Sequence, residues 1–188
     1  YVVHQMLVGD VDGDGKKEVV ASSYHSTFFP ARISVISDAG QLQGSYWNPG
    51  KPVKIALDDI DGDGKPEIIG GGGNNDNSNK ASVFILDGEN VTGELEAPPD
   101  KGSGAGGTDK QKCYTYLPTT GTDKYVSSIS VVTESGAKKI KADVPGYTYY
   151  LDSSCAVANL PLNPPPAASV SASEMYGVAP LTVFFTGS

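Results

Sequence analysis

Two short stretches of this chain repeat one pattern of acidic residues, and the chemistry of that pattern suits a metal ion. Residues 9–20 have the sequence GDVDGDGKKEVV, and residues 58–69 have the sequence DDIDGDGKPEII. Aligned without gaps, they place three aspartates and one glutamate in register: Asp10, Asp12, Asp14 and Glu18 in the first stretch, and Asp59, Asp61, Asp63 and Glu67 in the second. Carboxylates at positions 1, 3 and 5 of a tight loop, with glycine at position 6, offer the hard oxygen ligands that Ca²⁺ prefers. We predict one Ca²⁺ in each loop, with the backbone carbonyls of Lys16 and Lys65 and the two glutamates completing the ligand sets.

The residues around each loop separate this pattern from a helical calcium motif. An EF-hand needs a bidentate glutamate at position 12 and a helix on either side. Position 12 is Ala21 in the first copy and Gly70 in the second, and the flanks are rich in β-branched residues, which predicts strands. Asp-Gly runs are also common as plain solvated turns. We favour a metal site because four carboxylates crowded into one turn repel one another unless a cation binds.

Composition limits the classes of partner and compartment. The chain has 14 Lys and Arg against 22 Asp and Glu, a formal net charge of −8. An acidic chain without basic clusters is a poor binder of nucleic acid, because phosphate neutralisation needs Lys and Arg on one face. No run approaches the ~20 apolar residues of a membrane-spanning helix. In such a chain, with calcium loops, Cys113 and Cys155 predict a disulfide and an extracellular or cell-surface location.

The repeat extends beyond the acidic loops. A second strand-like segment follows each loop, at 32–40 and at 82–90, and each segment ends in a turn. In a weaker third copy, at 128–155, Lys139 replaces the glutamate and no aspartate remains at loop positions 1, 3 and 5. We therefore expect the third loop to bind no calcium. Repeats of about 50 residues with several strands each are typical of β-propeller blades, which predicts an all-β fold.

With these motifs, residues 1–160 resemble the FG-GAP/VCBS repeats of calcium-bearing β-propellers. The resemblance implies three blades, at about 1–48, 49–95 and 113–160, with a surface loop inserted at 96–112. It also implies that the calcium ligands are the eight acidic residues and two lysine carbonyls named above. The predicted disulfide would then tie the start of the third blade to its last strand.

The end of the chain has a different character. Residues 161–167 (PLNPPPA) have the composition of a stiff polyproline linker. Residues 168–188 resemble the opening of a PKD-type immunoglobulin-like domain, chiefly through the segments GVAPLTV and FTGS. Such a domain needs about seven strands, and this segment is long enough for about two. In a complete subunit, we expect it to add to the edge of a sheet in a neighbouring subunit.

No constellation of residues in the sequence predicts catalysis. The only histidines, His4 and His25, lack the spacing of metal ligands. The glycine run at 70–73 and the segment NNDNSN that follows it predict a flexible hairpin tip. We expect a non-catalytic, calcium-stabilised extracellular structural or adhesion module that contacts itself or other cell-surface proteins. A more specific version of this expectation is that the chain is the subunit of a cell-surface filament assembled by strand addition. The alternative is an accessory or catalytic part of a secreted polysaccharide-degrading enzyme, which would bind a glycan.

Overall fold

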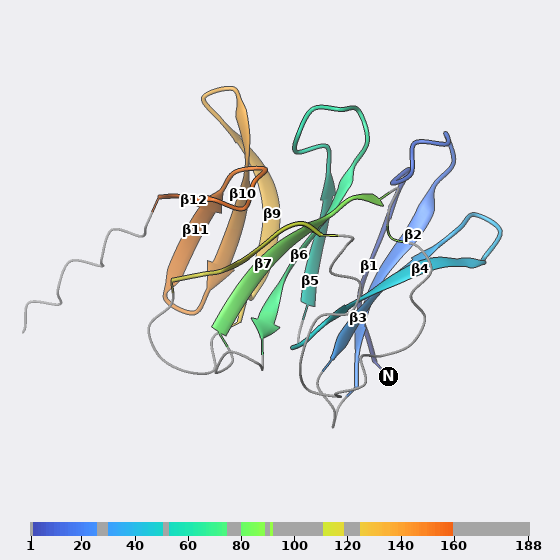
Figure 1. Cartoon of the computed structure of the whole chain (residues 1–188), viewed down its shortest axis with the longest axis horizontal. Coiled ribbons are helices and arrows are strands. Elements are labelled where there is room, and N and C mark those ends of the chain that lie inside the picture. Colours follow the sequence, from blue (N-terminus) through green and yellow to red (C-terminus); the bar gives the residue numbers. More distant parts are fainter. Residues whose placement is uncertain are drawn as a thin grey trace, which may run out of the picture.

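The chain folds into β-sheets throughout its described part. The computed structural model describes residues 2–25, 30–50, 53–74, 80–88, 91, 111–118 and 125–159. Within them lie twelve strands in three four-stranded antiparallel sheets, and no helix (Figure 1). The predicted all-β class is confirmed. The described residues form an open row of three sheets without closing into a barrel or propeller, so membership of a propeller stays a prediction.

Each sheet is a meander in which consecutive strands pair. The first sheet contains β1 (Val2–Gly9), β2 (Glu18–Tyr24), β3 (Ala31–Ile36) and β4 (Leu42–Asn48). The second sheet contains β5 (Val53–Asp58), β6 (Glu67–Asn74), β7 (Lys80–Leu86) and β8 (Gln111–Tyr116). The third sheet contains β9 (Ser128–Glu134), β10 (Ala137–Val144), β11 (Tyr147–Leu151) and β12 (Val157–Asn159). The first strands of neighbouring sheets, β1 with β5 and β5 with β9, lie next to each other.

The three sheets pack through two hydrophobic cores. The first core joins the first and second sheets, and the rings of Tyr46 and Phe84 lie 4.8 Å apart within it. The second core joins the second and third sheets and includes Ile69 and Ile140. The central sheet is therefore covered on both faces, and every residue of β6 is buried. A strand covered on both sides has few places for exposed polar side chains, which suits the sequence EIIGGGGN.

The glycine run at 70–73 lies inside β6, so its placement in the predicted hairpin tip is wrong. Residues 75–79, the rest of that prediction, lie outside the described residues. Gly70 pairs with Phe84 of β7, and a Cβ atom on Gly70 would meet the Phe84 ring at 2.1 Å. A Cβ atom on Gly71 would meet Cγ1 of Val126 at 2.7 Å on the other face. The glycines make room for Phe84 on the next strand and for Val126, which is distant in sequence.

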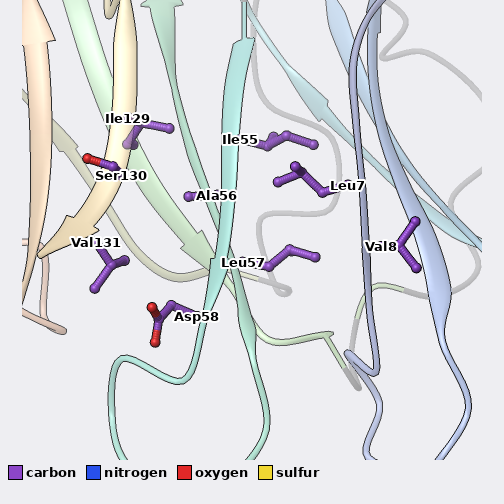
Figure 2. Close-up of a pocket in the computed structure, with 9 residues that line it drawn as sticks. All are labelled: Leu7, Val8, Ile55, Ala56, Leu57, Asp58, Ile129, Ser130 and Val131. Atoms are coloured by element: carbon purple, nitrogen blue, oxygen red, sulfur yellow. The ribbon is translucent and has the colours of Figure 1, made fainter.

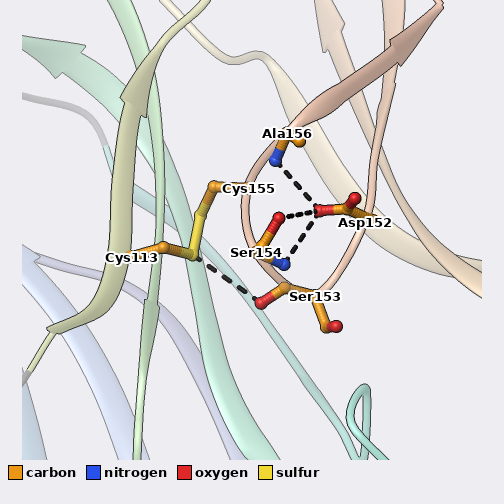
Figure 3. Close-up of a disulfide and its surroundings, with 6 residues drawn as sticks. All are labelled: Cys113, Asp152, Ser153, Ser154, Cys155 and Ala156. Atoms are coloured by element: carbon orange, nitrogen blue, oxygen red, sulfur yellow. Dashed lines mark hydrogen bonds between the residues drawn. A yellow bond between two sulfur atoms is a disulfide. The ribbon is translucent and has the colours of Figure 1, made fainter.

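Strand β8 belongs to the second sheet, where it pairs with β7. This corrects the expectation that the third blade begins at residue 113, since the third sheet begins with β9. The predicted disulfide between Cys113 and Cys155 is present, with the two Cα atoms 5.9 Å apart. Because Cys113 lies on β8 and Cys155 follows β11, the bond ties the second sheet to the third (Figure 3). It does not join two ends of one blade.

The turn that carries Cys155 is organised by the carboxylate of Asp152. Its Oδ1 atom accepts hydrogen bonds from the Ser154 hydroxyl at 2.6 Å, the Ser154 N–H at 2.8 Å and the Ala156 N–H at 3.0 Å (Figure 3). The bonds from Ser154 and Ala156, the Ser154 hydroxyl first, lower the pKa of the Asp152 carboxyl. Cys155 itself has a φ of 61°, in the left-handed region that few residues with a side chain adopt. The turn and the disulfide together hold this backbone conformation.

Three predicted features lie outside the described residues. They are most of the inserted loop at 96–112, the linker at 161–167 and the PKD-like segment at 168–188. The last two residues of the expected insertion, Gln111 and Lys112, are described and open strand β8.

Candidate metal centres

The two acidic loops occupy equivalent places in the first and second sheets. The first loop connects β1 to β2 and the second connects β5 to β6. In each, the strand pairing ends at the glutamate, so Glu18 lies opposite Gly9 and Glu67 lies opposite Asp58. The E-V-V and E-I-I segments start buried strands, which carries each glutamate from the loop into the protein interior. Glu18 is 1% exposed and Glu67 is 2% exposed.

In the first loop, the structure brings three predicted ligands together. Carboxylate oxygens of Asp10, Asp12 and Glu18 all lie within 4.8 Å of one another. Two hydrogen bonds close the loop around them: Oδ2 of Asp10 accepts from the N–H of Gly15 at 3.0 Å, and Oε2 of Glu18 accepts from the N–H of Val11 at 3.0 Å. We call these three carboxylates the first cluster.

The second loop repeats this geometry. Carboxylate oxygens of Asp59, Asp61 and Glu67, the second cluster, also lie within 4.8 Å of one another. Oδ2 of Asp59 accepts from the N–H of Gly64 at 3.0 Å, and Oε2 of Glu67 accepts from the N–H of Ile60 at 3.0 Å. Both loops therefore use the same scaffold, in which backbone N–H groups orient the first aspartate and the buried glutamate.

The aspartates at loop position 5 have a different role in the structure. Asp14 and Asp63 do not join the two clusters. The Oδ1 atom of Asp14 accepts a hydrogen bond from the N–H of Lys16 at 2.8 Å, and that of Asp63 accepts from Lys65 at 2.9 Å. These side chains support the tight turn, in which the flanking glycines have φ between 76° and 93°. The carbonyls of Lys16 and Lys65 stay predicted ligands.

The first cluster has the electrostatic character of a cation site. The Oδ1 atom of Asp10 is buried and has no hydrogen-bond partner among the described residues. Burial raises the pKa of the Glu18 carboxyl, and the negative charges of the neighbouring aspartates raise it further, against an opposing hydrogen bond from Val11. An acceptor without a donor, beside a carboxylate whose charge is disfavoured, fits a bound cation. A donor set made only of carboxylates suits a hard cation such as Ca²⁺ or Mg²⁺.

The second cluster contains a side chain that sequence reasoning missed. The Nζ atom of Lys112, on β8, lies 2.8 Å from Oδ2 of Asp61 and 2.7 Å from Oε1 of Glu67. The hydrogen bond from Lys112 is the main cause that lowers the pKa of the Asp61 carboxyl. Desolvation alone would lower the pKa of Lys112, but its bonds to the two carboxylates outweigh that effect and raise it. Because Glu67 and Lys112 are 45 positions apart in the sequence, no local pattern predicts this contact.

The connection in the third sheet is a tight turn. Strands β9 and β10 are joined through Ser135 and Gly136, whose φ values are 52° and 81°. Lys139 Nζ lies 2.5 Å from Oε2 of Glu134. The neighbouring Lys138 reaches the second sheet instead, where its Nζ atom bonds Asp58 Oδ1 at 2.6 Å and the carbonyl of Asp59 at 2.7 Å. The third connection thus directs a lysine towards the second acidic loop.

An open pocket of about 420 Å³ lies along the first strands of the three sheets (Figure 2). Its lining consists of Leu7 and Val8 on β1, residues 55–58 on β5 and residues 129–131 on β9. The one charged group in this lining, the Asp58 carboxylate, is bonded by Lys138.

Comparisons of the chain with protein-family models, with curated proteins and with solved structures found no match. The FG-GAP/VCBS and PKD-like resemblances therefore stay interpretations of the sequence motifs. None of the described residues belongs to a helix that could cross a lipid bilayer.

Proposed function

We propose that this chain is a non-catalytic, calcium-stabilised extracellular module that takes part in structural assembly or adhesion. The observation that carries the proposal is the repeated geometry of the two acidic loops. In each loop, carboxylate oxygens of two aspartates and a buried glutamate lie within 4.8 Å of one another, at the same place in the sheet. A turn needed only for its shape would gain nothing from a buried carboxylate surrounded by like charges.

Calcium would act on the connection between the first two strands of each sheet. An ion held by the first cluster links loop positions 1 and 3 to the glutamate that opens β2, and it neutralises the charges that raise the pKa of Glu18. If the dissociation constant lies a hundredfold below ambient calcium, each ion adds about 2.7 kcal/mol to stability. The disulfide between the second and third sheets adds a covalent tie and supports an oxidising compartment.

The assembly role is supported by the surface of the first sheet. On β1, the side chains of Val3, Met6 and Val8 are 56%, 63% and 62% exposed. Apolar side chains gathered on one strand mark a contact surface more often than an isolated exposed residue does. We propose self-association or binding to another cell-surface protein through such contacts, and strand addition by residues 168–188 remains the sharper form of the proposal.

Calcium titration of chelator-treated protein tests the metal part directly. We expect calorimetry to detect calcium binding and the melting temperature to rise with calcium. The double variant Asp10→Asn/Asp59→Asn should lose both effects, because it removes the first aspartate of each cluster. Glu134→Gln removes an acidic side chain at the corresponding connection of the third sheet and serves as the matched control. Absence of binding heat and of any change in melting temperature in the wild-type protein would refute the proposal.

A further inference from the structure

The outer strands of the first and second sheets place one residue each over the two clusters. In the first sheet, Val35 pairs with Gly44 and Ile36 with Leu42, so Gln43 is the extra residue of a β-bulge in β4. In the second sheet, Ile85 pairs with Cys113 and Leu86 with Gln111, so Lys112 is the extra residue of a bulge in β8. Gln43 and Lys112 therefore occupy equivalent positions. A bulge redirects its side chain relative to the regular strand.

Both bulge residues reach the second aspartate of their loop, with different chemistry. Gln43 Nε2 lies 3.4 Å from Oδ2 of Asp12, which is a weak contact of a neutral amide. Lys112 Nζ lies 2.8 Å from Oδ2 of Asp61 and also contacts the buried Glu67. Asp87 adds a third carboxylate, 4.0 Å from the same ammonium. The charge of the second cluster is thus already offset in part by a cation that belongs to the chain.

The contact with Glu67 is the decisive one for a metal ion. Oε2 of Glu67 accepts from the N–H of Ile60, and Oε1 accepts from Lys112. A metal ion in the second cluster would have to compete for the carboxylate oxygens that Lys112 uses. The ion and the Lys112 ammonium would also repel each other, because both would lie against the same carboxylates. The ion can bind with full strength only after the ammonium swings away.

We propose that Lys112 is a tethered competitor of the metal ion, so that the two clusters are unequal sites. This inference rests on the proposed calcium function. The first cluster, which is contacted by the neutral Gln43, binds calcium more tightly. The second cluster binds calcium more weakly because Lys112 must be displaced. Without calcium, Lys112 keeps the second loop ordered, whereas the first loop depends on its ion. The difference in affinity that we expect is about tenfold to a hundredfold, the range typical of a charged hydrogen bond.

Reciprocal exchange of the two bulge residues tests this role. Calcium chloride is titrated calorimetrically into the full chain in two backgrounds: Asp59→Asn/Asp61→Asn, which isolates the first cluster, and Asp10→Asn/Asp12→Asn, which isolates the second. Lys112→Gln should raise the calcium affinity of the second cluster at least tenfold. Gln43→Lys should lower the affinity of the first by a similar factor.

The matched control is Lys138→Gln. It also removes a positive charge beside the second loop, but Lys138 bonds Asp58 and a backbone carbonyl rather than Asp61 or Glu67. A general charge effect would raise affinity equally in both lysine variants, and this result would overturn direct competition. A second readout is the melting temperature. Lys112→Gln should lower it in chelator and raise the increment that calcium produces, whereas a merely structural lysine would lower it equally under both conditions.

The possible failures can be told apart. If the first cluster binds calcium and Lys112→Gln leaves the affinity of the second unchanged or weaker, the competitor role is wrong and the proposed function stands. If neither cluster binds calcium in any variant, both the competitor role and the calcium function are wrong.

Discussion

Replacing Gly70 by alanine tests the packing that lets the central sheet be covered on both faces. Gly70 lies on the first-core side of β6, directly opposite Phe84 on β7. A Cβ atom at this position would lie 2.1 and 2.2 Å from two atoms of the Phe84 ring. Ordinary contacts of a Cβ atom begin at 3.4 Å. The Phe84 ring would therefore have to move away from β6 to accommodate the new methyl group.

The ring has little room to move. Phe84 is fully buried, with the Tyr46 ring centroid 4.8 Å away and the parallel Tyr114 ring 6.0 Å away. Overpacking of a core costs about 1–3 kcal/mol, and a confined aromatic ring belongs at the upper end of that range. Loss of the glycine's freedom in the unfolded chain returns about 0.5–1 kcal/mol. We therefore expect Gly70→Ala to lower the free energy of unfolding by about 2 kcal/mol, or the melting temperature by about 4–8 °C.

Denaturant unfolding of four proteins measures this effect and its cause: wild type, Gly70→Ala, Phe84→Leu and the double variant. Because leucine lacks the ring that clashes, the double variant should be more stable than the sum of the single effects predicts, by about 1 kcal/mol or more. Gly71→Ala is the neighbouring comparison on the opposite face. Its Cβ atom would meet methyl groups of Val126 and Ile129 at 2.7 and 2.9 Å, which can shift more easily. Additive effects, or an unchanged stability of Gly70→Ala, would refute this account of the glycine run.

Two further predictions concern the junction between the second and third sheets. Cys113 and Cys155 are 42 residues apart in sequence, for which the chain-entropy relation gives about 4 kcal/mol; Cys113→Ala/Cys155→Ala should therefore unfold at lower denaturant, by up to that free energy, and should become insensitive to reductant. A variant as stable as the oxidised wild type would contradict the bond's role. Asp152→Ala removes the acceptor of three hydrogen bonds and should cost about 1 kcal/mol at pH 7. Because the folded pKa of Asp152 is lowered, its contribution is present above the unfolded pKa of about 3.9 and is lost as pH falls through the folded value. The stability gap between wild type and Asp152→Ala should therefore close in acid, and a gap that is constant from pH 7 to pH 2 would contradict the assignment.

The acidic clusters illustrate what a sequence pattern can predict. Ligands that lie within one loop, such as Asp10 and Asp12, are brought together by the turn itself, and the spacing of their carboxylates contains that information. Glu18 follows from the same pattern because the strand pairing opposite Gly9 fixes where it enters the interior. The separate role of Asp14, which bonds the loop backbone, depends on side-chain rotation that spacing does not determine.

Contacts across the long β7–β8 connection show why the rest could not be predicted. Strand β7 ends at Leu86 and β8 begins at Gln111, so the pairing of β8 is decided by tertiary packing and not by a short hairpin turn. Without that pairing, the sequence could not place Lys112 in the second cluster or Cys113 on the second sheet. The prediction for the glycine run was wrong because the spacing of the glycines does not show which side chains face them. Its meaning depends on Phe84 and Val126, which pack against it from other segments.

Burial further distinguishes the central sheet from its two neighbours. In β6 every position is buried, whereas β10 on the third sheet alternates from Lys139 to Val144 between partly exposed and buried residues.

The outward-facing residues of the first and third sheets differ in their chemistry. Met6 and Val8 project from the first sheet on the opposite side of β1 from Leu7, and they are apolar and exposed. On the third sheet the corresponding outward positions include Lys139 and Lys141, which pair with acidic neighbours. The charged face is satisfied by water and by its own ion pairs, while the apolar strand gains from being covered. The two ends of the row of sheets therefore differ in chemistry. A partner that packs against the row would bury the most apolar surface at the first sheet.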